Sequence, residues 1–168
     1  MMALGDRRCI LGIDPTPRGL AFVSFEDGGV QDWGTRMAGS MEEMVKALDV
    51  LTGRCAAEVL VLEDERAPEC RRRMRMRVAL RRLAAHARKG GLEVVAVPRE
   101  AVTSAWRVRG ARTKYAIARE IGNGFDELEP LVPEPRLHQD IEPAGIQLFD
   151  AASLVLQAFG VEEATSAA

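Results

Sequence analysis

The stretch CILGIDPTPRGLAFVSFEDGG, residues 9–29, decides how the fold begins. Its first part, residues 9–14, is an apolar run that Pro15 interrupts, which predicts a short buried strand. Residues 19–26 mix bulky apolar and small side chains in a pattern typical of a second strand. The turn at 27–29 and the run at 30–37 predict a third strand in a hairpin with the second. We therefore expect the chain to open with three antiparallel strands.

The rest of the chain predicts helices alternating with two more strands. These elements are a helix from a Ser40–Glu43 capping box to Gly53, a buried strand in 57–65, a long helix from Pro68 to about Lys89, a strand at 92–98, helices at 99–106 and 113–122, an extended proline-rich connection at 125–145 and a final helix at 146–160.

This order predicts an α/β fold with one mixed sheet. Because crossovers between parallel strands are right-handed, the strand in 57–65 should lie beside the first strand and parallel to it. Helices would cover both faces of the five-stranded sheet, which is the layout of the ribonuclease H-like fold. With 168 residues and no flexible linker, we expect residues 1–168 to form a single domain.

Composition excludes several classes of protein. The sequence has no apolar run of about 20 residues that could span a membrane, and its N-terminus does not resemble a signal peptide. Three cysteines without a CxxC motif argue against a disulfide framework and a structural zinc site. We therefore expect a protein of the reducing cytoplasm.

Charge is unevenly distributed along the chain. The net charge is only −2, but residues 66–119 hold 16 of the 23 Lys and Arg residues and three acids. A basic centre between acidic flanks points to a polyanionic partner. An Arg-rich surface exposed only to solvent is the alternative.

Three acids are candidates for a metal site. Asp14 and Glu63 end two strands that should be parallel neighbours, so their carboxylates would emerge at one sheet edge. Asp150 lies near the start of the last helix, and small residues after it would let that helix approach the sheet. Mg²⁺ prefers carboxylate oxygens and would relieve their repulsion. Structural alternatives are a turn cap at Asp14 and a helix-dipole partner at Asp150.

Four segments, in order, resemble the RuvC-type Holliday-junction resolvases. GIDPTPRGLAFVSFEDG (12–28) is similar to their opening motif, and VLVLED (59–64) to their second acidic strand. RVRGARTKYAIA (107–118) is similar to their glycine-x-small-x-lysine segment, and FDAASLVL (149–156) to their closing helix. The resemblance spans residues 9–159 and marks the chain as a divergent relative.

The resemblance implies a Mg²⁺-dependent endonuclease, with Mn²⁺ as a possible substitute, that hydrolyses phosphodiesters in branched or structured DNA, commonly as a homodimer. Carried over, Asp14, Glu63 and Asp150 would be metal ligands and Lys114 the active-site lysine. Gln147 stands where many members have an acid or histidine, so it would be a neutral fourth ligand. Asp140 or Glu142 could supply the missing charge instead.

The basic centre is expected to bind nucleic acid. On a helix running from Pro68, Arg71, Arg75 and Arg82 would share one face opposite an apolar stripe. Glu69 is the only acid between 66 and 92, so we expect phosphates to neutralise this face. An acidic protein surface, including that of a second copy, is the alternative. Arg109, Arg112 and Lys114 form a second basic stretch with the same expected role.

Two rival functions can be compared with this one from the sequence. The neutral Gln147 could mark a catalytically impaired module that binds nucleic acid on a ribonuclease H-like fold. An actin-like phosphotransferase also begins with a Gly-Ile-Asp strand, but it needs two such domains, for which the sequence is too short.

Overall fold

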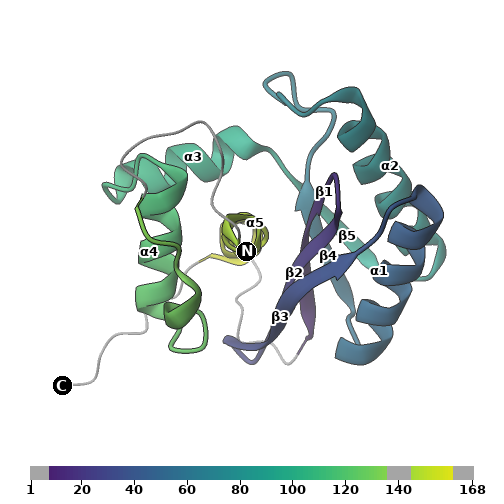
Figure 1. Ribbon diagram of the computed structural model, residues 1–168, viewed down its shortest axis with the longest axis horizontal. Helices are drawn as coiled ribbons and strands as arrows, with labels where there is room; N and C mark the ends of the chain where they lie inside the picture. The colour runs from purple at the N-terminus through teal and green to yellow at the C-terminus, as the bar shows by residue number, and fades with distance from the viewer. Residues whose placement is uncertain (1–7, 136–144, 161–168) are drawn as a thin grey trace.

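The computed structural model describes residues 8–135 and 145–160, and its five strands form one mixed sheet (Figure 1). The strands are β1 (Ile10–Thr16), β2 (Gly19–Glu26), β3 (Gly29–Met37), β4 (Val59–Glu63) and β5 (Glu93–Val97), in the order β3-β2-β1-β4-β5. β1 and β2 are antiparallel, as are β2 and β3, whereas β4 lies parallel to both β1 and β5. The predicted mixed sheet is confirmed.

The hairpin between β2 and β3 follows from its turn residues. Asp27 and Gly28 have φ angles of 51° and 80°. Two successive positive φ angles define the tight turn whose twist matches that of the strands, and Asp-Gly is among the sequences that adopt it most readily.

Helices cover both faces of the sheet (Figure 1). Leu11, Leu20 and Leu60 point to the face covered by α1 (Met41–Cys55) and α2 (Met74–Lys89). Val23 and Val61 point to the other face, where the remaining helices pack. These are α3 (Arg99–Val108), α4 (Lys114–Gly124) and α5 (Ile146–Phe159), with the short 3-10 helix η1 (Glu129–Leu131) following α4. The core therefore has one layer on each side of the sheet.

Helix α5 lies directly against β1. A methyl group at Gly12 would stand 2.5 Å from Val155 Cγ2 and 2.8 Å from the carbonyl oxygen of Ala151, both on α5. Ala151 is fully buried at this contact, as is the next residue of the helix, Ala152. The expected close approach of the last helix is thus confirmed, and it depends on small residues on both partners.

The start of α2 differs from the prediction. The helix begins at Met74, not at Pro68. Residues 64–70 turn instead, with the amide of Ala67 bonded to the Asp64 carbonyl and that of Cys70 to the Ala67 carbonyl. Arg71 therefore precedes the helix, and only Arg75 and Arg82 of the predicted basic face lie on it.

Other departures are small. β1 continues past Asp14 to Thr16, and α1 runs through Gly53 to Cys55 before Ala56 ends it with a left-handed conformation. Within the described ranges, no helix has the length and apolarity needed to cross a bilayer. The cysteines Cys9, Cys55 and Cys70 are free thiols.

Candidate active site

Asp14 and Glu63 lie where β1 and β4 part. The last parallel pair between these strands joins Gly12 to Val61, so both acids stand just beyond it. The Asp14 residue is 1% exposed and Glu63 is 3% exposed. The two strands therefore deliver two buried carboxyl groups to one sheet edge, as predicted.

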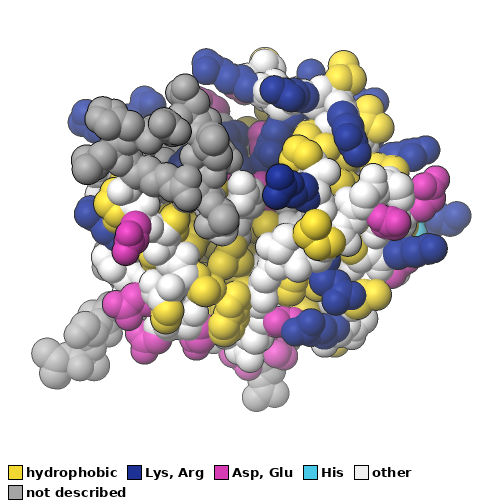
Figure 2. Space-filling view, in the orientation of Figure 1, with side chains coloured by type: hydrophobic (Ala, Val, Ile, Leu, Met, Phe, Trp, Pro, Cys, Tyr) yellow, Lys and Arg dark blue, Asp and Glu magenta, His cyan; other side chains and the backbone are white. Residues whose placement is uncertain are grey.

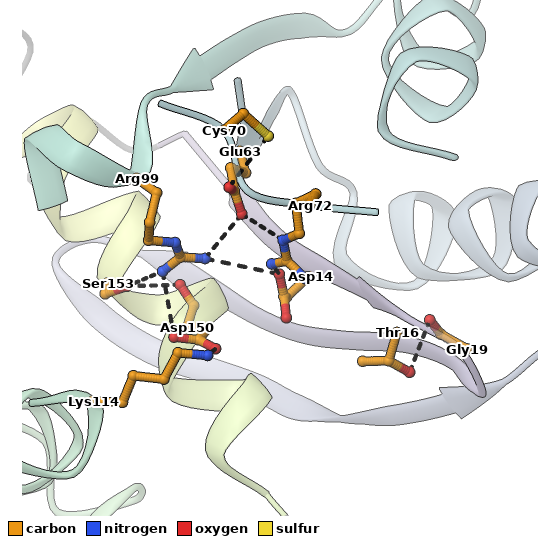
Figure 3. Close-up of polar contacts among 10 residues, drawn as sticks. All are labelled: Asp14, Thr16, Gly19, Glu63, Cys70, Arg72, Arg99, Lys114, Asp150 and Ser153. Carbon is orange, nitrogen blue, oxygen red and sulfur yellow. Dashed lines mark hydrogen bonds and ion pairs between the residues drawn. The ribbon is translucent and has the colours of Figure 1, made fainter. Parts of the chain in front are cut away.

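Asp150 reaches the same edge from α5. It is the fifth residue of that helix and is 7% exposed. Its position follows from the contact of α5 with Gly12, which lies two residues before Asp14 on β1. Figure 3 shows the three carboxyl groups facing a common space.

Two arginines stand between these acids (Figure 3). The Arg72 guanidinium donates to Glu63 Oε2 over 2.8 Å and also to Asp14 Oδ1. The Arg99 guanidinium lies 3.3 Å from both Glu63 Oε2 and Asp150 Oδ1, and 3.9 Å from Asp14 Oδ1. Each carboxylate is thus held by at least one guanidinium.

Burial shifts the titration of Asp14. Burial is the main cause that raises the pKa of Asp14 to about 7, and the neighbouring carboxylates of Asp150 and Glu63 raise it further. Arg72 and Arg99 act in the opposite direction without cancelling these effects. The raised pKa therefore reflects burial more than repulsion, since Arg72 and Arg99 lower it at least as much as Asp150 and Glu63 raise it.

The acids open onto a pocket of about 680 Å³. Lys114 and Gln147 line it with the acids, as does the exposed Arg71. The Lys114 ammonium lies 3.1 Å from Asp150 Oδ2, at the first turn of α4, where Thr113 caps the helix. The structure thus brings together all the predicted ligands and the predicted lysine. Asp140 and Glu142 lie outside the described residues.

The chemistry of the donors fits a hard divalent cation, but the present side-chain arrangement does not hold one. Three carboxylates supply the oxygen ligands that Mg²⁺ prefers. Among the residues described, however, no group of three or more His, Cys, Asp and Glu side chains is placed to hold a metal ion. The guanidinium groups of Arg72 and Arg99 lie between the acids and take up carboxylate oxygens that a metal ion would use.

Comparisons with known proteins agree at the level of fold. No protein-family model matches the chain, and no curated protein matches it in sequence. Among solved structures, Thermus thermophilus RuvC is similar over 90% of this chain and 93% of its own, with a TM-score of 0.57 and 19% identity. The same protein in complex with a Holliday-junction substrate gives a TM-score of 0.59 and 18% identity over the same shares.

The yeast mitochondrial Holliday-junction resolvase Ydc2 is similar over 95% of this chain and 79% of its own, with a TM-score of 0.61 and 14% identity. The chain has the RuvC fold. The expected ribonuclease H-like architecture is thereby confirmed, and the RuvC fold accounts for the meeting of Asp14, Glu63 and Asp150 at one edge of the sheet.

Sequence reasoning missed two residues of this RuvC-fold site, Arg72 and Arg99. The position of Arg99 could have been predicted. It lies two residues after Val97, the last residue of β5, and Val97 pairs with Glu63 across the parallel strands. The rule that strand ends meet at one edge applies to basic residues as well. Nothing in the run Arg71-Arg72-Arg73 singled out Arg72, because its position depends on the turn that replaces the predicted start of α2.

The basic surface is partly paired within the chain. Arg81 donates to both oxygens of the buried Glu65 over 3.0 and 3.1 Å, and Arg77 donates to the Glu65 carbonyl. An acid of the chain itself therefore neutralises part of the charge of these two arginines, which lie outside the predicted DNA-binding set. The predicted DNA contacts are all exposed; they are Arg71, Arg75, Arg82, Arg109, Arg112 and Lys114. In the view of Figure 2, Lys and Arg side chains lie along the upper edge and the right side of the molecule.

Proposed function

We propose that this protein is a metal-dependent endonuclease that hydrolyses phosphodiesters in branched or structured DNA. The observation that carries the proposal is the meeting of Asp14, Glu63 and Asp150 with Lys114 in one pocket on a RuvC fold. Burying three carboxyl groups together costs stability, so a site of this kind is better explained by chemistry than by folding.

Branched DNA is the proposed substrate because of the solved relatives and the surface charge. A Holliday junction is bound by T. thermophilus RuvC in one of the similar structures. In this chain the exposed Arg71 lines the pocket, and arginine pairs well with phosphate oxygens. We further propose a homodimer, since a four-way junction offers two equivalent strands.

Mg²⁺, or Mn²⁺ in its place, is the proposed cofactor, held by Asp14, Glu63 and Asp150 with Gln147 as a neutral ligand. Such an ion, when bound, activates water for attack on phosphorus and stabilises the departing oxygen. Burial raises the pKa of Asp14, and a bound cation would favour its ionised form.

The chain's own cations have different proposed roles. The Lys114 side chain is 49% exposed and touches Asp150, so it can reach a phosphate at the pocket mouth. Arg99 holds the carboxylates of Glu63 and Asp150 in place from the start of α3. Arg72 is the cation that must move, because it bridges the two acids on β1 and β4.

Cleavage of a labelled four-way junction tests the proposal. The protein should nick the junction in Mg²⁺ or Mn²⁺, fail to do so in EDTA, and leave a linear duplex of the same sequence largely intact. Asp14→Asn is the matched inactive variant, and Asp126→Asn, at an exposed position after α4, should cleave like the unaltered protein.

Two results would overturn the proposal. Equal cleavage by Asp14→Asn and the unaltered protein would remove Asp14 from the chemistry. Junction binding without cleavage in any divalent metal would instead support the nucleic-acid-binding module considered from the sequence.

A further inference from the structure

A second pocket, of about 360 Å³, lies at the opposite end of β1 from the acids. Two of the three cysteines, Cys9 and Cys55, line it together with Ser24, Asp32 and Arg54. Cys9 immediately precedes β1, whereas Asp14 lies near the other end of the strand. The proposed nuclease activity gives this pocket no role.

Backbone geometry brings the two thiols together. The Cys9 carbonyl accepts hydrogen bonds from the amides of Glu58 and Val59, over 3.0 and 3.4 Å, where β4 begins. Cys55 is the last residue of α1, three residues before Glu58. The side chains meet in this corner, where the Cys9 thiol and the Cys55 sulfur share a hydrogen bond.

The two thiols occupy different environments. Cys9 is only 5% exposed, whereas Cys55 is partly open to solvent. The hydrogen bond with Cys9 lowers the pKa of Cys55 to about 6 against the opposing effect of burial, and Ser24 and the Arg54 charge help to lower it. The same hydrogen bond, together with burial, raises the pKa of Cys9. Cys55 is thus the more accessible of the two thiols, and its hydrogen bond with Cys9 favours the thiolate there.

We propose that Cys55 is a thiol that reacts with hydroperoxides and that Cys9 is its resolving partner. In the first step, the Cys55 sulfur attacks one peroxide oxygen, the O–O bond breaks, and a sulfenic acid and hydroxide form. In the second step, the Cys9 sulfur attacks the Cys55 sulfur, the S–O bond breaks, and the Cys9 proton leaves with the hydroxyl as water. The two thiols lose two electrons, and the peroxide takes them up.

Peroxide treatment of the full chain under native conditions tests this inference. Mass spectrometry of the intact protein should show the loss of two hydrogen atoms, and digestion without reductant should yield one peptide pair joined through Cys9 and Cys55. Because the bridge closes a loop of about 45 residues, the oxidised protein should unfold at a higher temperature, and dithiothreitol should reverse the shift.

Single variants separate the two roles. Cys9→Ser should leave Cys55 as a sulfenic acid that dimedone traps, whereas Cys55→Ser should leave Cys9 largely unmodified. Cys70→Ser is the control, since the Cys70 sulfur lies 3.8 Å from Glu63 Oε1, beside the acids, and should not affect the bridge.

Alkylation of the unaltered protein keeps the inference testable if a variant does not fold. At about neutral pH, iodoacetamide should modify Cys55 at least tenfold faster than Cys9, since only the thiolate reacts. Similar rates for these two cysteines, or a bridge that includes Cys70, would overturn the proposal. None of these outcomes depends on DNA cleavage, so they leave the proposed nuclease activity untouched.

Discussion

The carboxyl group of Asp14 makes the stability of the metal-free protein depend on pH. Its pKa of about 7 in the folded protein lies above the ordinary value of 3.8. Between these values the unfolded chain has lost a proton that the folded chain keeps, so stability falls as pH rises from about 4 to 7. Asp14→Asn cannot ionise and should escape this decline.

We therefore expect Asp14→Asn, measured in EDTA, to melt several degrees above the unaltered protein at about pH 8 and close to it at about pH 4. Thermal unfolding followed by circular dichroism at both values gives the comparison. Asp126→Asn serves as the control, and an Asp14→Asn difference that is the same at both pH values would contradict the assignment.

Arg72 competes with any cation for the oxygens of Asp14 and Glu63. Arg72→Ala should lower the metal-free stability by about 3 kcal/mol, because two buried carboxylates lose their partner. The same change should tighten Mn²⁺ binding tenfold or more, which corresponds to about 1.4 kcal/mol. Chemical unfolding and calorimetric titration measure these opposite effects. Arg82→Ala, at an exposed position on α2, should change neither quantity much, and weaker Mn²⁺ binding by Arg72→Ala would refute the competition.

Gln147 offers the complementary test of the ligand set. It lines the acidic pocket at the start of α5, about one helical turn before Asp150. If it occupies the fourth ligand position, Gln147→Asp should tighten Mn²⁺ binding in a calorimetric titration, because it replaces a neutral oxygen donor with an anionic one. Unchanged affinity would show that Gln147 does not face the ion.

At the scale of elements, the contact between β1 and α5 sets the position of Asp150. Gly12→Ala should cost about 1–3 kcal/mol of stability, because the new methyl group meets Val155 and the Ala151 backbone. Gly53→Ala is the matched control: it lies in the last turn of α1 with nothing within 4 Å of the added methyl group, and it should be neutral or stabilising. Urea unfolding of both variants tests the contact, and equal stability of the two would contradict it.

The helices and strands also show which parts of the fold could be predicted from the sequence. The meeting of Asp14 and Glu63 at two strand ends was predictable. Apolar runs in the sequence locate the two strands, and the right-handedness of crossovers places them side by side. The start of α2 was not predictable from the pattern. Arginine favours helix, and residues 68–73 continue the basic run, but turns at Asp64 and Ala67 and the pairing of Arg72 with two acids override that preference.

At the scale of the whole molecule, the exposed arginines form the proposed path for DNA. The triple variant of Arg71, Arg75 and Arg82 to Ala should weaken binding similarly for all sequences and should reduce the slope of log K against log salt by about three. Lys46→Ala, on the exposed surface of α1, should leave the slope nearly unchanged. Binding titrations over a range of salt concentrations provide the measurement.

Sedimentation of the same triple variant without DNA separates DNA contact from dimer contact. A variant that remains a dimer with a lower slope supports the DNA path. A variant that becomes monomeric would place these arginines in a subunit interface, and a dimer with an unchanged slope would remove them from the path altogether.

Asp150 stands 136 residues after Asp14 in the chain, and the two meet only because α5 packs on β1. Contacts between such distant segments form slowly, since closing a long loop costs entropy before the contact repays it. During synthesis, the sheet strands that carry Asp14 and Glu63 emerge well before α5 does. The proposed hydrolytic centre is therefore incomplete in every partly made chain, and a nuclease assembled in this order would be unable to cut DNA until α5 had been made and had docked on the sheet.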